Sequence, residues 1–258
     1  MTTMNRPRMI AALVAVASLA ACSGRGVQDL TSTLPTTAVK FFNFAMGAPT
    51  VNFYAGEVKM TGVNSTSGTE SNSGTGYGSV GAGGFYSSIT PGAYTITARI
   101  TAVTDNGLPI ASTPVTLADG KGYSYYLSGV YNTTTKQSDA FLVQDDVPAI
   151  DYTQTNVRFV NAIFNSSQQI LWARNTVTGD SVQVGGPIAY KAASAFKAMP
   201  GAVYDLTVRN VGSNAAVITR AGVSFSSSRS YTITARGDIT VVSTTATNRP
   251  ILDNTANF

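Results

Sequence analysis

The sequence predicts an all-β protein, and three observations lead to this fold class. Short segments in which apolar or β-branched residues alternate with polar ones recur along the chain, at 38–44, 94–100, 123–127, 157–160, 204–209 and 231–235. Turn-forming pairs such as Pro91-Gly92 and Pro200-Gly201 separate them. No segment carries the apolar stripe of an amphipathic helix. Many short strands between frequent turns are typical of a β-sandwich or barrel.

The N-terminus has the layout of a secretory signal. Arg6 and Arg8 precede the uncharged segment 9–21, which ends in small residues before Cys22. That segment is shorter than the roughly 20 residues that a membrane-spanning helix needs. A cysteine at the cut site is similar to a bacterial lipoprotein signal, the lipobox. The resemblance implies cleavage of residues 1–21 and a lipid on the Cys22 thiol.

Cys22 has two other interpretations, because a lone cysteine is often a small buried residue and the signal could be an ordinary cleaved one. However, the polar segment 22–36, a predicted flexible tether, offers no core to bury the thiol. Lipidation is therefore expected, with acyl chains such as palmitate holding the protein on a membrane. Ser23 after the cysteine is similar to the sorting signal of enterobacterial outer-membrane lipoproteins. We expect a place in the bacterial cell envelope, on the outer membrane, facing the periplasm or the surface.

The charge pattern argues against a nucleic-acid partner. The formal net charge is +4, charged residues make up 12% of the chain, and no run of Lys or Arg occurs. With Cys22 as the only cysteine, no internal disulfide can form, and the fold depends on its core. Charged residues inside strands, such as Lys40 and Arg158, are expected to face water on the outer side of a sheet.

The chain repeats itself, which predicts two domains. Three pairs of segments match in the same order: 39–43 with 157–161, 91–99 with 200–209, and 115–123 with 223–231. We therefore predict two tandem immunoglobulin-like or prealbumin-like β-sandwich domains after the signal peptide. The expected boundaries are a first domain at 37–146 with a Gly/Ser-rich insertion at 61–84, a linker at 147–154, a second domain at 155–243 and a C-terminal tail at 244–258.

The repeated motifs resemble one family. They are a Val-Lys/Arg-Phe-x-Asn strand at 39–43 and 157–161, a following strand with Phe53-Tyr54 or Leu171-Trp172, a Pro-Gly turn entering an Arg-ended strand, and a late Tyr-bearing strand. This pattern resembles the DUF4397 domains, secreted or lipid-anchored bacterial β-sandwich modules of uncharacterised role. The resemblance covers about 37–146 and 155–243 and implies no catalytic residue. The family's usual His-Ala-Ser-Pro after the first strand is Asn43-Phe44-Ala45-Met46 here.

Catalytic patterns are weak. The chain has no histidine, which excludes Ser-His pairs and histidine-ligated metals. Ser194 and Lys197 fit a Ser-x-x-Lys pattern, but in a strand these positions face opposite sides. Residues 76–81 have the glycine spacing of a dinucleotide loop without the following helix, and are interpreted as a flexible loop. We expect no enzyme activity and no cofactor.

The densest acidic cluster is Asp145, Asp146 and Asp151. Oxygen ligands this close could hold Ca²⁺ at a domain junction. The alternating spacing of a calcium loop is missing, however, and Pro148 marks the segment as a linker. We favour a solvated hinge over an ion site, and expect no bound metal.

Aromatic residues offer the remaining route to function. Trp172 and Tyr54 occupy equivalent strands of the two copies, and Tyr126 lies on the opposite face of its strand from its tyrosine neighbours. Rings exposed on a sheet can stack on sugars or anchor a protein partner. These three residues are the candidate ligand-stacking positions, and the alternative is that each belongs to the core or to a cross-strand pair.

The predicted function is that of a lipid-anchored envelope protein acting as a non-catalytic binding or scaffolding module, with a glycan or another envelope protein as partner. One alternative is a cell-wall-associated hydrolase or transferase that uses two carboxylates. Another is a structural spacer that holds a second protein off the membrane. Acidic side chains that face into one cleft would favour the hydrolase or transferase. Sandwich faces without aromatic or charged patches would favour the spacer.

Overall fold

The computed structural model describes residues 36–62 and 73–257, which all belong to one compact unit. The expected signal peptide, Cys22 and almost all of the tether lie outside the described residues. Nearly all of the regular structure is β-strand, with one short 3₁₀ turn, η1 (Gly81–Gly84), so the prediction of an all-β sandwich fold is confirmed. No helix in the described part of the chain has the length and apolar character that crossing a membrane would require.

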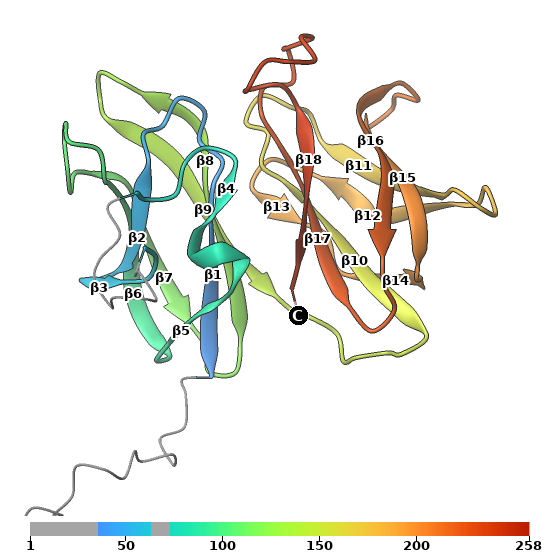
Figure 1. Cartoon of the computed structure of the whole chain (residues 1–258), viewed down its shortest axis with the longest axis horizontal. Helices are drawn as coiled ribbons and strands as arrows, with labels where there is room; N and C mark the ends of the chain where they lie inside the picture. The colour runs from blue at the N-terminus through green and yellow to red at the C-terminus, as the bar shows by residue number, and fades with distance from the viewer. Residues whose placement is uncertain (1–35, 63–72, 258) are drawn as a thin grey trace, which may run out of the picture. The chain divides into compact units, whose positions relative to one another are not determined.

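The first half of the chain forms two stacked sheets (Figure 1). One sheet has the order β4-β1-β8-β9 with β5 also paired to β1, and the other has the order β3-β2-β6-β7. The strands are β1 (Thr37–Asn43), β2 (Val51–Ala55), β3 (Val58–Lys59), β4 (Ser79–Val80), β5 (Ser87–Ile89), β6 (Gly92–Ile100), β7 (Pro109–Leu117), β8 (Gly122–Asn132) and β9 (Gln137–Asp145).

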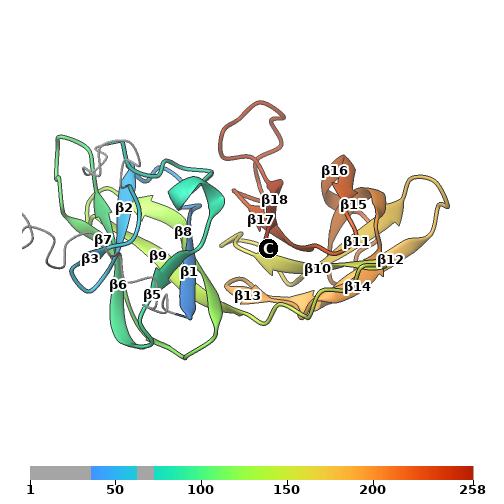
Figure 2. The ribbon, with the colours of Figure 1, turned by 60° about the horizontal axis from the view of Figure 1, so that its bottom comes forward.

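The second half has the same strand arrangement, with sheets β13-β10-β17-β18 and β12-β11-β15-β16 (Figure 2). Its strands are β10 (Gln154–Asn161), β11 (Gln169–Asn175), β12 (Ser181–Ile188), β13 (Ala192–Ala193), β14 (Lys197–Pro200, paired to β10), β15 (Ala202–Asn210), β16 (Ala216–Phe225), β17 (Ser230–Arg236) and β18 (Ile251–Ala256). In both halves the first strand pairs in parallel with the late Tyr-bearing strand, β1 with β8 and β10 with β17. We call β4-β1-β8-β9 and β13-β10-β17-β18 the inner sheets and the other two the outer sheets.

Each sandwich has its own core between its inner and outer sheets. In the first, Phe41 of β1 stacks on Phe53 of β2 with ring centroids 5.0 Å apart, and both belong to one buried cluster. In the second, the ring centroids of Tyr231 of β17 and Phe225 of β16 lie 5.0 Å apart. Burying one such side chain stabilises the fold by about 1.5–3 kcal/mol. The two cores can therefore stabilise the domains without a disulfide.

The central strands of the inner sheets are buried on both faces, because the two sheets pack against each other. β10 is buried at almost every position instead of at alternate ones. The face turned away from its own core contributes to a third apolar cluster that joins the halves, made of Phe42, Phe44, Tyr126, Phe141, Val160 and Ala162. A sheet covered on both faces reads as continuously apolar, which accounts for the Phe-rich sequence of β1.

The contact between the inner sheets also buries charge, so the expectation that Lys40 and Arg158 face water is wrong. Arg158 is 1% exposed and pairs with the buried carboxylate of Asp145. Its Nε donates to Thr232 at 2.8 Å. Lys40 is 2% exposed, and its Nζ donates to the carbonyl of Ala256 at 2.6 Å. In each half, the cation of the first strand thus reaches the end of the other half's last strand.

The acidic cluster is dispersed rather than gathered into a solvated hinge. Asp145 is buried in the inter-sheet contact, whereas exposed Asp146 lies 3.4 Å from Lys121. Asp151 accepts a hydrogen bond from the backbone N–H of Thr153 at 2.8 Å in a local turn. Among residues 36–62 and 73–257, no group of three or more His, Cys, Asp or Glu is arranged to hold a metal ion.

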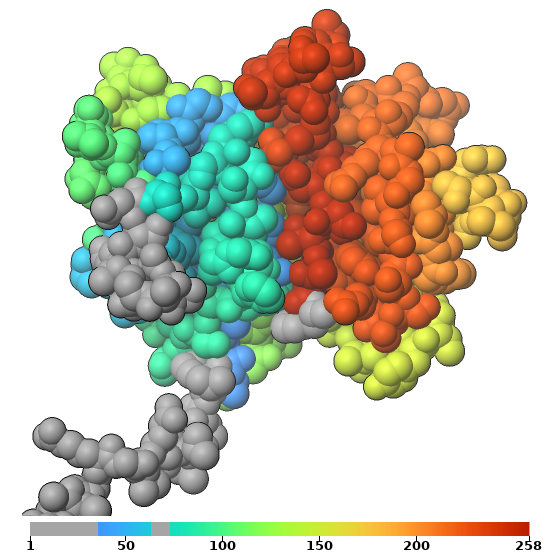
Figure 3. All heavy atoms as spheres, viewed as in Figure 1, coloured from blue at the N-terminus to red at the C-terminus, as the bar shows by residue number. Residues whose placement is uncertain are grey.

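The segments that were predicted as a C-terminal tail and as an insertion in the first domain both contribute to the sandwiches. The expected C-terminal tail contains β18, which pairs with β17 from Tyr231↔Ala256 to Arg236↔Ile251. The later part of the Gly/Ser-rich insertion supplies β4 and η1, with Val80 opposite Phe42. Figure 3 shows this segment, in teal, lying over the blue strand β1. Gly81 is buried there, and a Cβ at this position would lie 2.7 Å from Thr61.

Candidate functional site

The outer sheets place Tyr54 and Trp172 at equivalent positions. Each lies between two core residues of its strand, so its ring points away from the core and is half-buried on the outer face. Tyr54 lies opposite Thr97 of β6, and Trp172 lies opposite Thr207 of β15. An arginine accompanies each ring, which makes two ring–guanidinium pairs, one on each outer sheet.

In the first sandwich this pair is held by an acid. The Arg99 guanidinium lies 4.4 Å from the Tyr54 ring centroid. Arg99 also donates to both carboxylate oxygens of Glu57, at 2.8 and 3.0 Å, and the Arg99 guanidinium lowers the pKa of Glu57. The guanidinium is therefore committed to Glu57 and covers the tyrosine ring.

In the second sandwich the arginine has no such partner. Arg209 lies 5.6 Å from the Trp172 ring centroid. Its Nε is buried and makes no hydrogen bond within the described residues, and no ion pair of Arg209 occurs there. A cation without an acidic partner beside the chain's only tryptophan is the more available of the two ring–guanidinium pairs.

The structure corrects the assignment of Tyr126. This residue is 0% exposed in the contact between the inner sheets. Its ring is stacked between Phe42 at 4.5 Å and Phe141 at 4.9 Å, and burial raises the pKa of its hydroxyl to about 12. Both faces of the ring are covered, so a ligand cannot stack on it.

The residues of the two weak catalytic patterns have structural roles in the sheets. The Ser194 hydroxyl accepts from the backbone N–H of Phe159 at 2.9 Å and donates to the carbonyl of Ala195 at 2.8 Å, which fixes it as a structural group. In the glycine-spaced segment, the N–H of Gly78 donates to the carbonyl of Asn43 at 2.7 Å, so this backbone extends the inner sheet.

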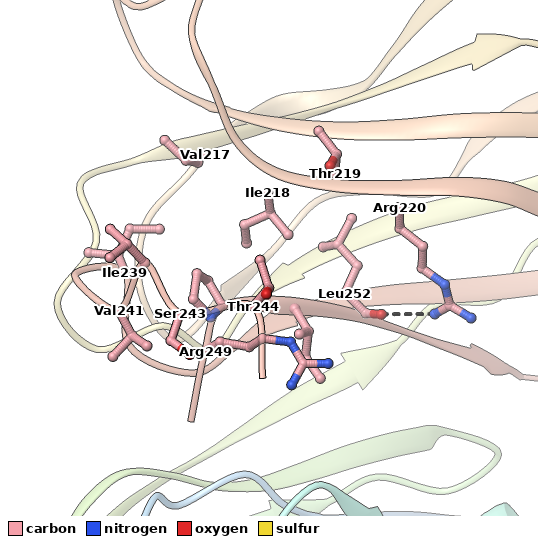
Figure 4. Close-up of a pocket in the computed structure, with 13 residues that line it drawn as sticks. Val217, Ile218, Thr219, Arg220, Ile239, Val241, Ser243, Thr244, Arg249 and Leu252 are labelled. Carbon is pink, nitrogen blue, oxygen red and sulfur yellow. Dashed lines mark hydrogen bonds between the residues drawn. The ribbon is translucent and has the colours of Figure 1, made fainter. Parts of the chain in front are cut away.

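A cleft in the second sandwich is a further candidate site that sequence reasoning missed. It has a volume of about 690 Å³ and lies between β16, at the edge of the outer sheet, and β18, at the edge of the inner sheet. The connection 237–250 between β17 and β18 forms its remaining wall. Figure 4 shows Val217, Ile239 and Val241 gathered at one end and the Arg220 guanidinium at the other.

Two arginines line the cleft. Arg220 donates to the carbonyl of Leu252 at 2.8 Å, across from one sheet to the other. Arg249 donates to the carbonyl of Ala246 at 3.0 Å. Neither guanidinium takes part in an ion pair with a described residue, so both positive charges are uncompensated by local acids. The apolar residues Ile239, Val241 and Val242 in a segment without strand alternation were the only sequence signal for this wall.

Comparisons with known proteins identify the family. The family model described as "Domain of unknown function (DUF4397)" matches residues 37–168, more than half of the 258 residues. The chain belongs to this family. The DUF4397 match spans the first sandwich and continues through β10. The description assigns no function, so membership supports the fold and a generic role only.

Other comparisons add little to the DUF4397 assignment. A comparison with curated proteins found no significant match. Among solved structures, a leucine-rich repeat protein from Bacteroides thetaiotaomicron is similar at 11% identity and a TM-score of 0.21, with 76% of this chain and 25% of that one covered. This chain thus spans about a quarter of that protein's length, and a likeness at this TM-score carries no argument about fold or function.

Proposed function

We propose that this DUF4397 protein is a lipid-anchored component of the bacterial cell envelope that acts as a non-catalytic binding module. The observation that carries the proposal is the pairing of Trp172 with Arg209, which has no acidic partner among the described residues, on the half-buried outer face of the second sandwich. A tryptophan face stacks on the apolar face of a sugar ring or on an apolar partner side chain. The neighbouring guanidinium favours a ligand that carries a carboxylate or phosphate.

The remaining surfaces support a division of roles between the sheets. The inner sheets are occupied by each other, through the cluster that includes Phe42 and Tyr126. In the first sandwich, Glu57 already holds the guanidinium that covers Tyr54. The outer sheet of the second sandwich is thus the surface with an available ring and charge, and acidic glycans of the envelope are the ligand class that fits both.

Membrane attachment through Cys22 is tested by fractionation. In cells fed labelled palmitate, the wild-type chain is expected to carry label and sediment with membranes, because two or more acyl chains hold a protein stably on a bilayer. The Cys22→Ser chain is expected to lose both properties. A wild-type chain that is unlabelled and released with the soluble fraction would reject the lipid anchor.

Ligand binding is tested by a glycan and peptidoglycan screen on the Cys22→Ser chain, which carries no lipid. Saturable binding that falls about tenfold or more in Trp172→Ala supports the proposal, since central aromatic residues carry most of the energy of such contacts. Tyr54→Ala is the matched control and is expected to bind as the parent does. Binding that both variants retain would place the ligand elsewhere, and no binding to any glycan would leave a protein partner to be sought by cross-linking in cells.

A further inference from the structure

The cleft between β16 and β18 is a second, separate site. We propose that it binds one molecule of an amphiphile with a single apolar chain and an anionic headgroup. The cleft lies at the edges of the two sheets and does not include Trp172 or Arg209. The inference therefore goes beyond the binding surface proposed above.

The apolar part of the argument is the floor of the cleft. Ile218 and Leu252 line it and belong to the buried core of the second sandwich, and Val217 and Ile239 pack against that core. An apolar chain placed between the sheets would extend this core and remove the partly exposed side chains of Val217 and Ile239 from water. The volume of about 690 Å³ lies within the roughly 300–1,000 Å³ of typical small-ligand pockets.

The charged part of the argument is the pair Arg220 and Arg249. Each donates to a backbone carbonyl, at 2.8 and 3.0 Å, and has no acidic partner in the described part of the chain. A guanidinium has five N–H donors, so both arginines retain donors for a headgroup. Arginine matches the geometry of carboxylate and phosphate oxygens, which selects an anionic over a neutral or cationic amphiphile.

The first sandwich is more closed at the equivalent edge. There, strands β7 and β9 contact each other more extensively than β16 and β18 do, and the side-chain amide of Gln137 donates to the carbonyl of Pro109 at 3.4 Å. The connection between β8 and β9 is the short turn 133–136, whereas the connection between β17 and β18 is the longer segment 237–250. The second sandwich thus combines less extensive contact between its sheet edges with a longer segment that lines the opening.

The test is calorimetric titration of the Cys22→Ser chain with fatty carboxylates of increasing length, below their micelle concentrations. We expect one molecule per chain, with affinity rising by up to about fourfold for each added methylene group. An alkyl trimethylammonium of equal chain length is expected to bind at least tenfold more weakly, because it cannot use the arginine donors. Equal affinity for the cationic and anionic amphiphiles, or no saturable binding, would overturn the proposal.

Variants then locate the site. Arg220→Gln with Arg249→Gln is expected to lower carboxylate affinity at least tenfold, and Thr244→Trp, at an exposed lining position, to block the cleft without touching the core. Arg174→Gln, at an exposed position of β11 away from the cleft, is the control for loss of a positive charge. If the double variant and Thr244→Trp both bind like the parent, the cleft is not the site. Trp172→Ala is expected to leave amphiphile binding unchanged, so this site and the glycan surface fail or succeed separately.

Discussion

Lys40 and Arg158 occupy equivalent places in β1 and β10, yet their electrostatic situations differ. Arg158 has an acidic partner in Asp145, which also accepts hydrogen bonds from Ser124 at 2.8 Å and Tyr86 at 2.7 Å. Among the described residues, the hydrogen-bond acceptor of Lys40 is a backbone carbonyl, and its ammonium lies 4.4 Å from the centroid of the Tyr86 ring. Within this part of the chain, the same strand position therefore holds a charge with a direct ion-pair partner in one half and a charge without one in the other.

The first prediction concerns the buried ion pair. Asp145→Asn leaves the Arg158 charge buried without its partner, and is expected to lower the free energy of unfolding by about 3–5 kcal/mol. The matched control is Asp146→Asn, whose exposed contact with Lys121 is worth less than about 1 kcal/mol. Denaturant titration measures both variants, and similar values for the two would show that Asp145 is not the key partner.

The second prediction concerns the pH dependence of stability. Burial lowers the pKa of Lys40 to about 8 from its usual 10.5, an effect that nearby Asp145 partly opposes. The unfolded chain therefore binds more protons than the folded one between about pH 8 and pH 10.5. The contribution of Lys40 to stability rises with pH across this window, because the folded protein no longer has to bury a charge.

Lys40→Met removes this titration. The free energy of unfolding of the wild type, relative to Lys40→Met, is expected to increase between about pH 8 and pH 10.5 and to level off outside that range. Denaturant titrations at several pH values measure the difference. A difference that stays flat or falls through the window would contradict a lowered pKa.

At the scale of elements, β18 is the strand at which the predicted end of the second domain and the observed fold differ. Its polar residues Asp253, Asn254 and Thr255 are consecutive and break the alternation of a strand, so the segment was predicted to be a tail. In the structure, Leu252 is 4% exposed and joins the core of the second sandwich. The strand also provides the carbonyl that accepts from Lys40, so it connects the two halves.

The third prediction tests β18 as part of the core. Leu252→Ala is expected to lower the free energy of unfolding by about 2–5 kcal/mol, the cost of truncating a buried leucine. Val242→Ala, at a 95% exposed position in the preceding connection, is expected to change it by less than about 0.5 kcal/mol. Thermal or chemical unfolding measures both, and an unaffected Leu252→Ala would return this segment to the status of a tail.

At the scale of the whole molecule, the inner sheets join two sandwiches that each have their own core. The joining cluster of Phe42, Phe44, Tyr126, Phe141, Val160 and Ala162 is apolar and aromatic. Residues of this cluster face away from their own cores. They would lie on the surface of a separated sandwich, and their burial is a property of the pair.

The fourth prediction follows from this arrangement. The wild type is expected to unfold in one calorimetric transition, because the contact between the inner sheets couples the halves. Phe42→Lys places an unpaired charge in that contact and is expected to split unfolding into two transitions, while each sandwich stays folded. Phe42→Leu keeps the contact apolar and is expected to retain one transition. A single transition in Phe42→Lys would argue that the halves are coupled elsewhere.

Much of the fold was accessible from the sequence for a local reason. Strand alternation and Pro-Gly turns are set by neighbouring residues, so the all-β class, the strand at Tyr54 and its equivalent at Trp172 could be placed without the structure. The outward direction of these two rings also follows from alternation with core residues. Each ring also pairs with a guanidinium from the neighbouring strand of the same sheet, so this contact does not depend on packing between sheets.

The sequence by itself thus determined the strand content, the family and one candidate surface. Only the tertiary structure decided that Tyr126, Lys40 and Arg158 are buried, since one apolar strand face looks the same whether it meets a core or another sandwich. It alone revealed the cleft, because β16 and β18 belong to different sheets whose edges meet only in the folded sandwich. Contacts between sheets depend on packing across the molecule, and the alternation of residues along one strand does not show which surface covers it.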